Sequence, residues 1–246
     1  HLKSFIFGGL DGIITTFAVV AAVVGGNLDW TVAVTLGVSN VLGTGISMGL
    51  GDYYSTKAEE DLARAERVRE GWEYDNHIEG ERAEMCEVLE SHGFTVEDAK
   101  QAIFILSKRR EFFVDFMMTH ELGILPPPEG KSKAAFGGLV MFLSFELFGS
   151  VPLVVFCALQ GAAHDAGLDP AKLRIAHFGA CIAATFLTKF ALGMCKAYIT
   201  GSSLVFGGVR MMANGAVAGG VVYLLAWAMS EIAITAGWKT TAGGLI

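Results

Sequence analysis

Acidic side chains recur at helical spacing in the middle of the chain. If residues 70–84 form a helix, a rotation of about 100° per residue places four carboxylates and one imidazole on one face: Glu70, Glu73, His77, Glu81 and Glu84. Ionised carboxylates on one stripe repel one another, and a cation among them relieves that repulsion. Oxygen and imidazole ligands suit divalent Fe, Mn and Zn. A solvated acidic helix face explains the same pattern, and Gly71 and Gly80 disfavour one straight helix.

Four further residues outside this stripe could take part in metal chemistry. Met117 and Glu121 are spaced i, i+4 and share a helix face, which on spacing alone indicates core packing beside a surface acid. Asp11 lies in a long apolar run, where an ionisable group is costly and is a functional candidate. A structural carboxylate capped by the Thr15 hydroxyl is the alternative. Met48, in the next apolar run, is either packing or a soft thioether ligand.

The distribution of charge indicates a membrane protein with one inserted aqueous domain. The chain has 246 residues, is 52% hydrophobic and has a mean hydropathy of +0.49, which is too apolar for an ordinary soluble domain. Of its 25 acidic residues, 18 lie between Lys57 and Lys133. The net charge of −7 argues against nucleic-acid binding. None of the four cysteines forms a C-x-x-C pair, so neither a disulfide framework nor a zinc knuckle is expected.

The apolar runs predict an all-α protein with five membrane-spanning helices. The expected spans are residues 5–26, 31–51, 134–160 and 173–200, and a fifth within 204–236. The polar insert between spans two and three predicts a three-helix domain, with helices near 73–91, 96–107 and 111–122. Its first helix is expected to follow a break at Gly71, and Thr95 is expected to cap the second. The resulting domains are 1–56 (spans one and two), 57–133 (the acidic domain) and 134–246 (spans three to five).

Basic residues near the span ends predict the orientation. The side that carries the acidic domain also receives Lys3, Lys196 and Arg210, whereas the opposite side has fewer cations. Since cytosolic loops carry the excess of Lys and Arg, the N-terminus and the acidic domain are predicted to be cytosolic and the C-terminus lumenal. Two further charges fall within spans, Glu146 and Lys189. They are expected either to form a structural pair or to take part in proton movement.

Several enzyme signatures are absent. The chain has no G-x-x-x-x-G-K-[ST] loop for ATP and no H-E-x-x-H zinc motif. The paired E-x-x-H motifs of di-iron bundles are also missing. The sequence therefore argues against an enzyme, and against a membrane ferroxidase in particular.

Three stretches carry a resemblance to a known family. They are FGGLDGIITTFAVVAA in the first span, GISMGLGDYYSTKAE in the second, and FFVDFMMTHELG in the last helix of the acidic domain. Together with the acidic spacing upstream, they make the chain resemble the vacuolar iron transporters over nearly its whole length. The resemblance implies five spans, a cytosolic helical metal-binding domain between spans two and three, and a homodimer. It also implies exchange of a divalent cation for protons at an acidic, vacuole-like organelle, without an organic cofactor.

The resemblance also implies a set of metal ligands. The family's acidic ligands fall on Glu70, Glu73, Glu81 and Glu84, in the same 3-8-3 spacing. Its last-helix pair falls on Met117 and Glu121, its intramembrane aspartate on Asp11 and its translocation methionine on Met48. Two positions depart from plant members, which have acidic residues where this chain has Asn40 and Ser4. His77 is not part of the family pattern, so its ligand role depends on helix geometry alone.

The sequence thus favours a proton-coupled antiporter that moves Fe²⁺ from the cytosol, and Mn²⁺, Co²⁺ or Zn²⁺ suit similar ligands. The alternative is a membrane metal sensor or adaptor whose acidic domain is a docking surface and which transports nothing.

Overall fold

The computed structural model describes residues 1–26, 28–128, 130, 132–168 and 170–235, and no strand occurs among them. Seven helices follow one another along the chain: α1 (Leu2–Gly25), α2 (Trp30–Ser91), α3 (Val96–Leu106), α4 (Arg110–His120), α5 (Ala134–Asp165), α6 (Pro170–Ile199) and α7 (Leu204–Thr235). The prediction of an all-α chain is confirmed. The expected last residue of span five, Ala236, lies outside the described residues.

Five of these helices, α1, α2, α5, α6 and α7, are long and apolar enough to cross a membrane, as the sequence predicts. The chain divides into two compact units, which we describe separately. The membrane unit comprises residues 1–52 and 136–246, and the acidic unit comprises residues 53–135. Helix α2 contributes to both, because no residue interrupts its backbone at the change from apolar to polar composition.

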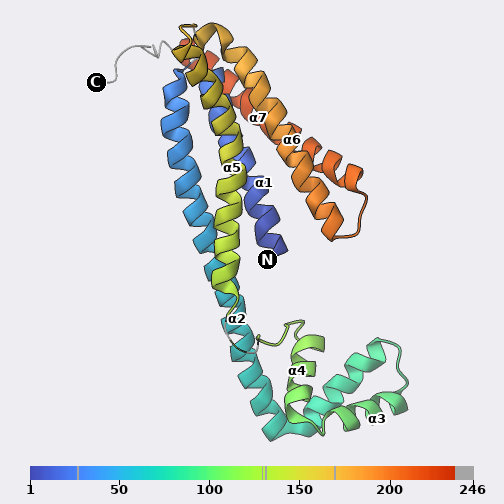
Figure 1. Ribbon diagram of the computed structural model, residues 1–246. Coiled ribbons are helices and arrows are strands. Elements are labelled where there is room, and N and C mark those ends of the chain that lie inside the picture. Colours follow the sequence, from blue (N-terminus) through green and yellow to red (C-terminus); the bar gives the residue numbers. More distant parts are fainter. Residues whose placement is uncertain (27, 129, 131, 169, 236–246) are drawn as a thin grey trace. The chain divides into compact units, whose positions relative to one another are not determined.

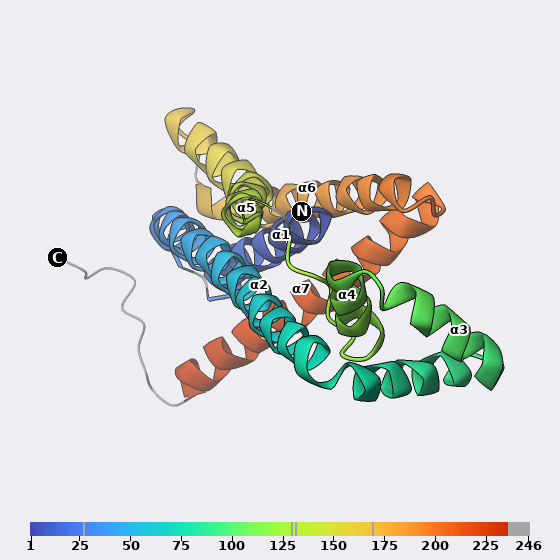
Figure 2. The same cartoon turned by 90° about the horizontal axis from the view of Figure 1, so that it is seen from below.

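Helix α1 is central to the membrane unit. Figures 1 and 2 show it beside α5 and α6, with α7 crossing it. Glycines allow a close approach to α5: a Cβ on Gly8 would lie 2.6 Å from the carbonyl oxygen of Met141, and Gly12 meets the backbone of Gly149. Towards its C-terminal end, α1 contributes Phe17 and Val20 to an apolar core shared with α5 and α6.

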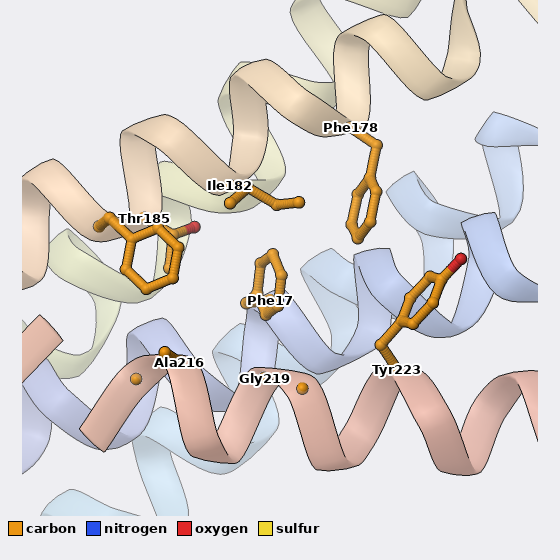
Figure 3. Close-up of a pocket in the computed structure, with 10 residues that line it drawn as sticks. Phe17, Phe178, Ile182, Thr185, Ala216, Gly219 and Tyr223 are labelled. Carbon is orange, nitrogen blue, oxygen red and sulfur yellow. The ribbon is translucent and has the colours of Figure 1, made fainter. Parts of the chain in front are cut away.

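An apolar cavity of about 340 Å³ lies between α1, α6 and α7. Figure 3 shows Phe17, Phe178 and Tyr223 around it. The ring of Phe178 stacks on both others, with centroids 5.7 Å from Phe17 and 6.0 Å from Tyr223. Gly219 leaves the space that Phe17 occupies, because a Cβ there would lie 2.8 Å from the Phe17 ring.

In the acidic unit, α2 changes direction at His77, whose backbone is non-helical (φ −136°, ψ 30°). The expected break at Gly71 is therefore wrong. Gly71 remains helical and instead gives room to Arg110, whose guanidinium donates to the Gly71 carbonyl at 3.0 Å. Arg110 also binds both carboxylate oxygens of Asp75, at 2.8 and 2.7 Å. These contacts attach the start of α4 to the turn of α2 that precedes the kink.

Helices α3 and α4 lie close to their predicted positions. Thr95 caps α3, since its hydroxyl accepts from the backbone N–H of Asp98 at 3.2 Å. The apolar core of the unit is formed by Met85, Ile103, Phe113 and Met117, from α2, α3 and α4. At its edge, the hydroxyl of Tyr74 donates to the carbonyl of Ser107 at 2.7 Å. The two parts of α2 are thus fixed against the same small core.

We expect Gly12→Ala to lower the thermal unfolding midpoint of the detergent-solubilised protein. The added Cβ meets the backbone of α5, which cannot move aside as a side chain can, and such overpacking typically costs about 1–3 kcal/mol. Gly179→Ala is the matched control, because nothing lies within 4 Å of its Cβ position. That change is expected to be neutral or mildly stabilising. Equal midpoints for the two variants would contradict the close α1–α5 contact.

Candidate metal centre

Five glutamates of the acidic unit form two overlapping triads. A carboxylate oxygen from each of Glu70, Glu73 and Glu81 lies within 4.8 Å of the others, and the same holds for Glu81, Glu84 and Glu121. Glu81 belongs to both triads and so joins them. Four of the five come from α2, and Glu121 is the residue that ends α4. We call these five residues the acidic cluster.

The kink at His77 is what brings the cluster together. Along a straight helix, Glu70 and Glu81 are eleven residues apart and would be separated by about 16 Å. The change of direction between them instead brings their carboxylates within 4.8 Å of each other. The five positions therefore do not lie along one straight helix, although the four glutamates converge. His77 does not join them: its side chain is exposed and its ring packs edge-on against Trp72, with centroids 5.5 Å apart.

Burial makes glutamates of the cluster weaker acids than usual. Glu70 is fully buried and Glu81 is 7% exposed, and no donor among the described residues reaches the Oε2 atom of Glu70. Burial, with neighbouring carboxylates as a second cause, raises the pKa of Glu70 to about 7 and the pKa of Glu81 to about 7. The pKa of Glu121 is raised for the same reasons. Glu70 and Glu81 therefore hold or release a proton near neutral pH.

Arg69 is the cation that contacts the cluster. Its guanidinium lies 2.9 Å from a carboxylate oxygen of Glu70 and 3.7 Å from one of Glu73. The i, i+4 spacing of Arg69 and Glu73 is the sequence signal that indicates this contact. One guanidinium cannot neutralise five carboxylates. A divalent cation held by hard oxygen ligands would supply the remaining positive charge.

Met117 lies in the core beside this cluster. Its side chain is fully buried among Met85, Ile103 and Phe113. The next turn of α4 ends at Glu121, whose backbone N–H donates to the Met117 carbonyl at 2.9 Å. The core packing expected from the spacing is therefore observed. A ligand role for the Met117 thioether stays a prediction.

The membrane unit contains the other two predicted residues. Asp11 on α1 and Met48 on α2 are both partly buried. The Thr15 hydroxyl donates to the backbone carbonyls of Asp11 and Gly12, at 2.8 and 3.2 Å, and not to the Asp11 carboxylate. Among the described residues, neither a cation nor a hydrogen-bond donor contacts that carboxylate. Thr15 therefore does not cap the Asp11 carboxylate, which was the structural alternative from the sequence.

One acid of the membrane unit escaped the sequence reasoning. Asp52, at the end of the apolar part of α2, accepts a hydrogen bond from the Ser4 hydroxyl at 3.0 Å. Asp52 therefore places a carboxylate beside Ser4 from another helix, at a position where the resemblance noted from the sequence implies an acid. The motif GDYYSTKAE contains Asp52, but its contact with Ser4 joins residues 48 positions apart and has no local signal.

Of the two alternatives for Glu146 and Lys189, the structural pair is not observed among the described residues. A buried carboxylate oxygen of Glu146 lies over Gly45 of α2. Lys189 is fully buried and extends over Gly215 of α7. Neither group has a hydrogen-bond partner among the described residues.

Comparison with known proteins gives matches over most of the chain. A model of the VIT family matches residues 2–227. The chain is 39% identical to the "Vacuolar iron transporter" of Toxoplasma gondii, over 91% of this chain and 72% of that protein. It is 36% identical to the protein of the same name from Plasmodium berghei, over 91% and 80%. It is 30% identical to "Vacuolar iron transporter 1" of Arabidopsis thaliana, over 92% and 84%.

These relatives are named as transporters and not as enzymes, in agreement with the absence of enzyme motifs. The match extends over both units, from the first residues of α1 to within α7. The acidic unit is therefore part of the matched region and not an addition to it. On the length matched and on these identities, the chain belongs to the VIT family.

Proposed function

We propose that this protein transports Fe²⁺ from the cytosol into an acidic, vacuole-like organelle in exchange for protons. The acidic cluster is the observation that carries the proposal. It places five carboxylates around overlapping sites, and two of them have a pKa near 7. The names of the relatives support iron as the cargo and the vacuole as the organelle. The five apolar helices support a membrane location.

The acidic cluster acts as the collecting site in this proposal. At cytosolic pH, Glu70 and Glu81 are partly ionised, and a divalent cation competes with protons for their oxygens. The other glutamates and the surrounding negative charge raise the local concentration of cations. Oxygen ligands of this kind accept Fe²⁺ and Mn²⁺, and also Co²⁺ or Zn²⁺. A thioether from Met117 would favour the softer ions within this set.

Asp11 and Met48 are proposed to form the path through the membrane. A carboxylate without a protein partner is available to a passing cation, and it is costly to keep ionised in a span without one. Protonation of Asp11 from the acidic lumen would release the metal, because a protonated carboxyl group is a poor ligand. This step couples proton movement from the lumen to the cytosol to metal movement from the cytosol to the lumen. We infer a homodimer with Asp11 and Met48 near its axis, and a cytosolic acidic unit, as the resemblance and the positive-inside pattern favour.

Glu81→Gln should weaken Mn²⁺ binding to the detergent-solubilised protein roughly tenfold or more, because Glu81 belongs to both triads. Isothermal titration calorimetry at pH 7.5 measures the affinity. Glu87→Gln removes an exposed acid of the same helix and is the matched control. Equal losses in the two variants would show that the total negative charge, and not the acidic cluster, holds the metal.

The metal-free protein should lose stability as pH rises from about 4.5 to 7. The folded-state pKa of Glu70 and Glu81 is raised from 4.5 to about 7, so the folded protein binds protons more tightly than the unfolded chain in this range. Mn²⁺ should reverse the trend, since it binds the ionised form. The unfolding midpoint, recorded at several pH values with and without Mn²⁺, measures both effects. A Glu70→Gln/Glu81→Gln variant should show a weaker pH dependence and little response to Mn²⁺. An unchanged profile in this variant would exclude these acids as its source.

Asp11→Asn should abolish Fe²⁺ flux into proteoliposomes that have an acidic interior, while Mn²⁺ binding by the acidic cluster stays intact. The amide keeps the shape of the side chain but cannot carry the charge or exchange the proton. Asp165→Asn, at the exposed end of α5, is the control and should transport normally. Normal flux in the Asp11 variant would exclude the proposed path. Metal binding without flux in the unaltered protein would favour the sensor or adaptor instead.

A further inference from the structure

A polar pocket lies where α6 turns into α7. Its volume is about 410 Å³, and residues from α1, α6 and α7 line it. The polar members of the lining are Lys196, Ser202, Ser203, Arg210 and Asn214. The lining includes no acidic residue. In Figure 1 the turn is at the same end of the membrane unit as the N-terminus.

The two cations of this pocket have no partner within the part of the chain that the structure describes. Both side chains are exposed, and neither makes an ion pair or a hydrogen bond with any described residue. The arginines of the acidic unit that contact acids behave differently, since Arg67 and Arg110 each bind two carboxylates. Two like charges in one pocket repel each other, and an anion between them would turn that repulsion into attraction.

The backbone around the pocket is fixed by close packing. A Cβ on Gly193 would lie 2.6 Å from the carbonyl oxygen of Gly207, so α6 and α7 touch at this level. Gly201 takes a positive φ of 66° in the turn, and Ser202 donates its N–H to the Ala197 carbonyl at 2.9 Å. The turn leads directly into the first N–H groups of α7, a helix of 32 residues. Such N–H groups lack acceptors within their helix and favour an anion.

The depth of the cations suits a lipid headgroup. Lys196 precedes the last residue of α6 by three positions, and Arg210 follows the first residue of α7 by six. At 1.5 Å per residue they lie about 5 and 9 Å from the helix ends. Long basic side chains at this depth extend towards the headgroup region, where phosphates lie. The apolar members of the lining, Leu10, Phe206 and Met211, would contact the part of a lipid next to its headgroup.

We propose that this pocket binds the phosphate group of an anionic phospholipid from the leaflet at the N-terminal end of α1. Lys196 and Arg210 supply the charge, and the hydroxyls of Ser202 and Ser203 donate hydrogen bonds. The apolar lining next to the cations favours a lipid over a free phosphate ion, because the ion has no apolar part to contact it.

Native mass spectrometry of the full chain in a neutral detergent, titrated with phosphatidic acid, tests the proposal. The unaltered protein should retain phosphatidic acid more strongly than phosphatidylcholine. Lys196→Gln and Arg210→Gln should each weaken retention about fivefold, which corresponds to about 1 kcal/mol per charge. Arg210→Lys should restore most of it. Lys3→Gln removes a cation at the same end of α1 but outside the pocket lining, and should have no effect.

A second arm identifies the source of the phosphate. Inorganic phosphate at millimolar concentration should not displace phosphatidic acid. Displacement at that concentration would overturn the lipid assignment and leave a soluble anion as the ligand. Retention that is equal in Arg210→Gln, Lys196→Gln and Lys3→Gln would overturn the pocket itself. Circular dichroism of each variant verifies that the helices remain, so a loss of binding is not a loss of fold.

Discussion

The electrostatic cost of holding glutamates together dominates the acidic unit. Five carboxylates share a small volume, and two of them are almost fully removed from water. Without other contacts the carboxylates would move apart, because their mutual repulsion and the loss of their hydration both oppose the arrangement. Contacts of α2 with α3 and α4 oppose this separation. The core of Met85, Ile103, Phe113 and Met117 supplies part of that resistance.

Arginine contacts between helices supply the rest. Arg67 binds Glu111 and Asp115 on α4. Arg110 binds Asp75 and the Gly71 carbonyl just before the kink. Asp75 behaves in the opposite way to the buried glutamates of the cluster: its pKa is lowered, because the Arg110 guanidinium donates to it. The unit thus neutralises the acids that maintain its shape and leaves the cluster with a deficit of positive charge. A deficit confined to one place is what gives a divalent ion a preferred position.

The sequence predicts those parts of this arrangement that depend on neighbouring residues. Apolar runs predict all five spans, and the Thr95 cap needs only Asp98 three residues later. The kink at His77 could not be predicted, since glycine is the residue expected to break a helix and Gly71 and Gly80 both lie nearby. Gly71 stays helical, and its lack of a side chain admits the guanidinium of Arg110, 39 residues later.

Pairings between distant helices were equally hidden from the sequence. A structural pair of Glu146 and Lys189 is one of the two interpretations that the sequence allows, since each charge is costly alone in a span. Their helices direct them to different neighbours, Gly45 and Gly215, where small residues admit a long side chain. The contact of Ser4 with Asp52 is the converse case, a pair that no spacing indicates. The rotation of each helix about its axis and its position along its neighbour determine which of these side chains meet. Both depend on the packing of distant helices and not on local sequence.

The rotation of α1 connects the packing of the membrane unit to the proposed path. Gly8 and Gly12 are one turn apart and both face the backbone of α5. Asp11 is offset from Gly12 by about 100° around the helix axis, so the α5 contact directs its carboxylate away from that interface. The same glycines therefore determine how closely α1 approaches α5 and in which direction Asp11 points. A larger residue at either position would rotate or displace α1 and so misplace the Asp11 carboxylate without removing it. Loss of Fe²⁺ flux in such a variant would therefore reflect altered helix packing and not the loss of the carboxylate.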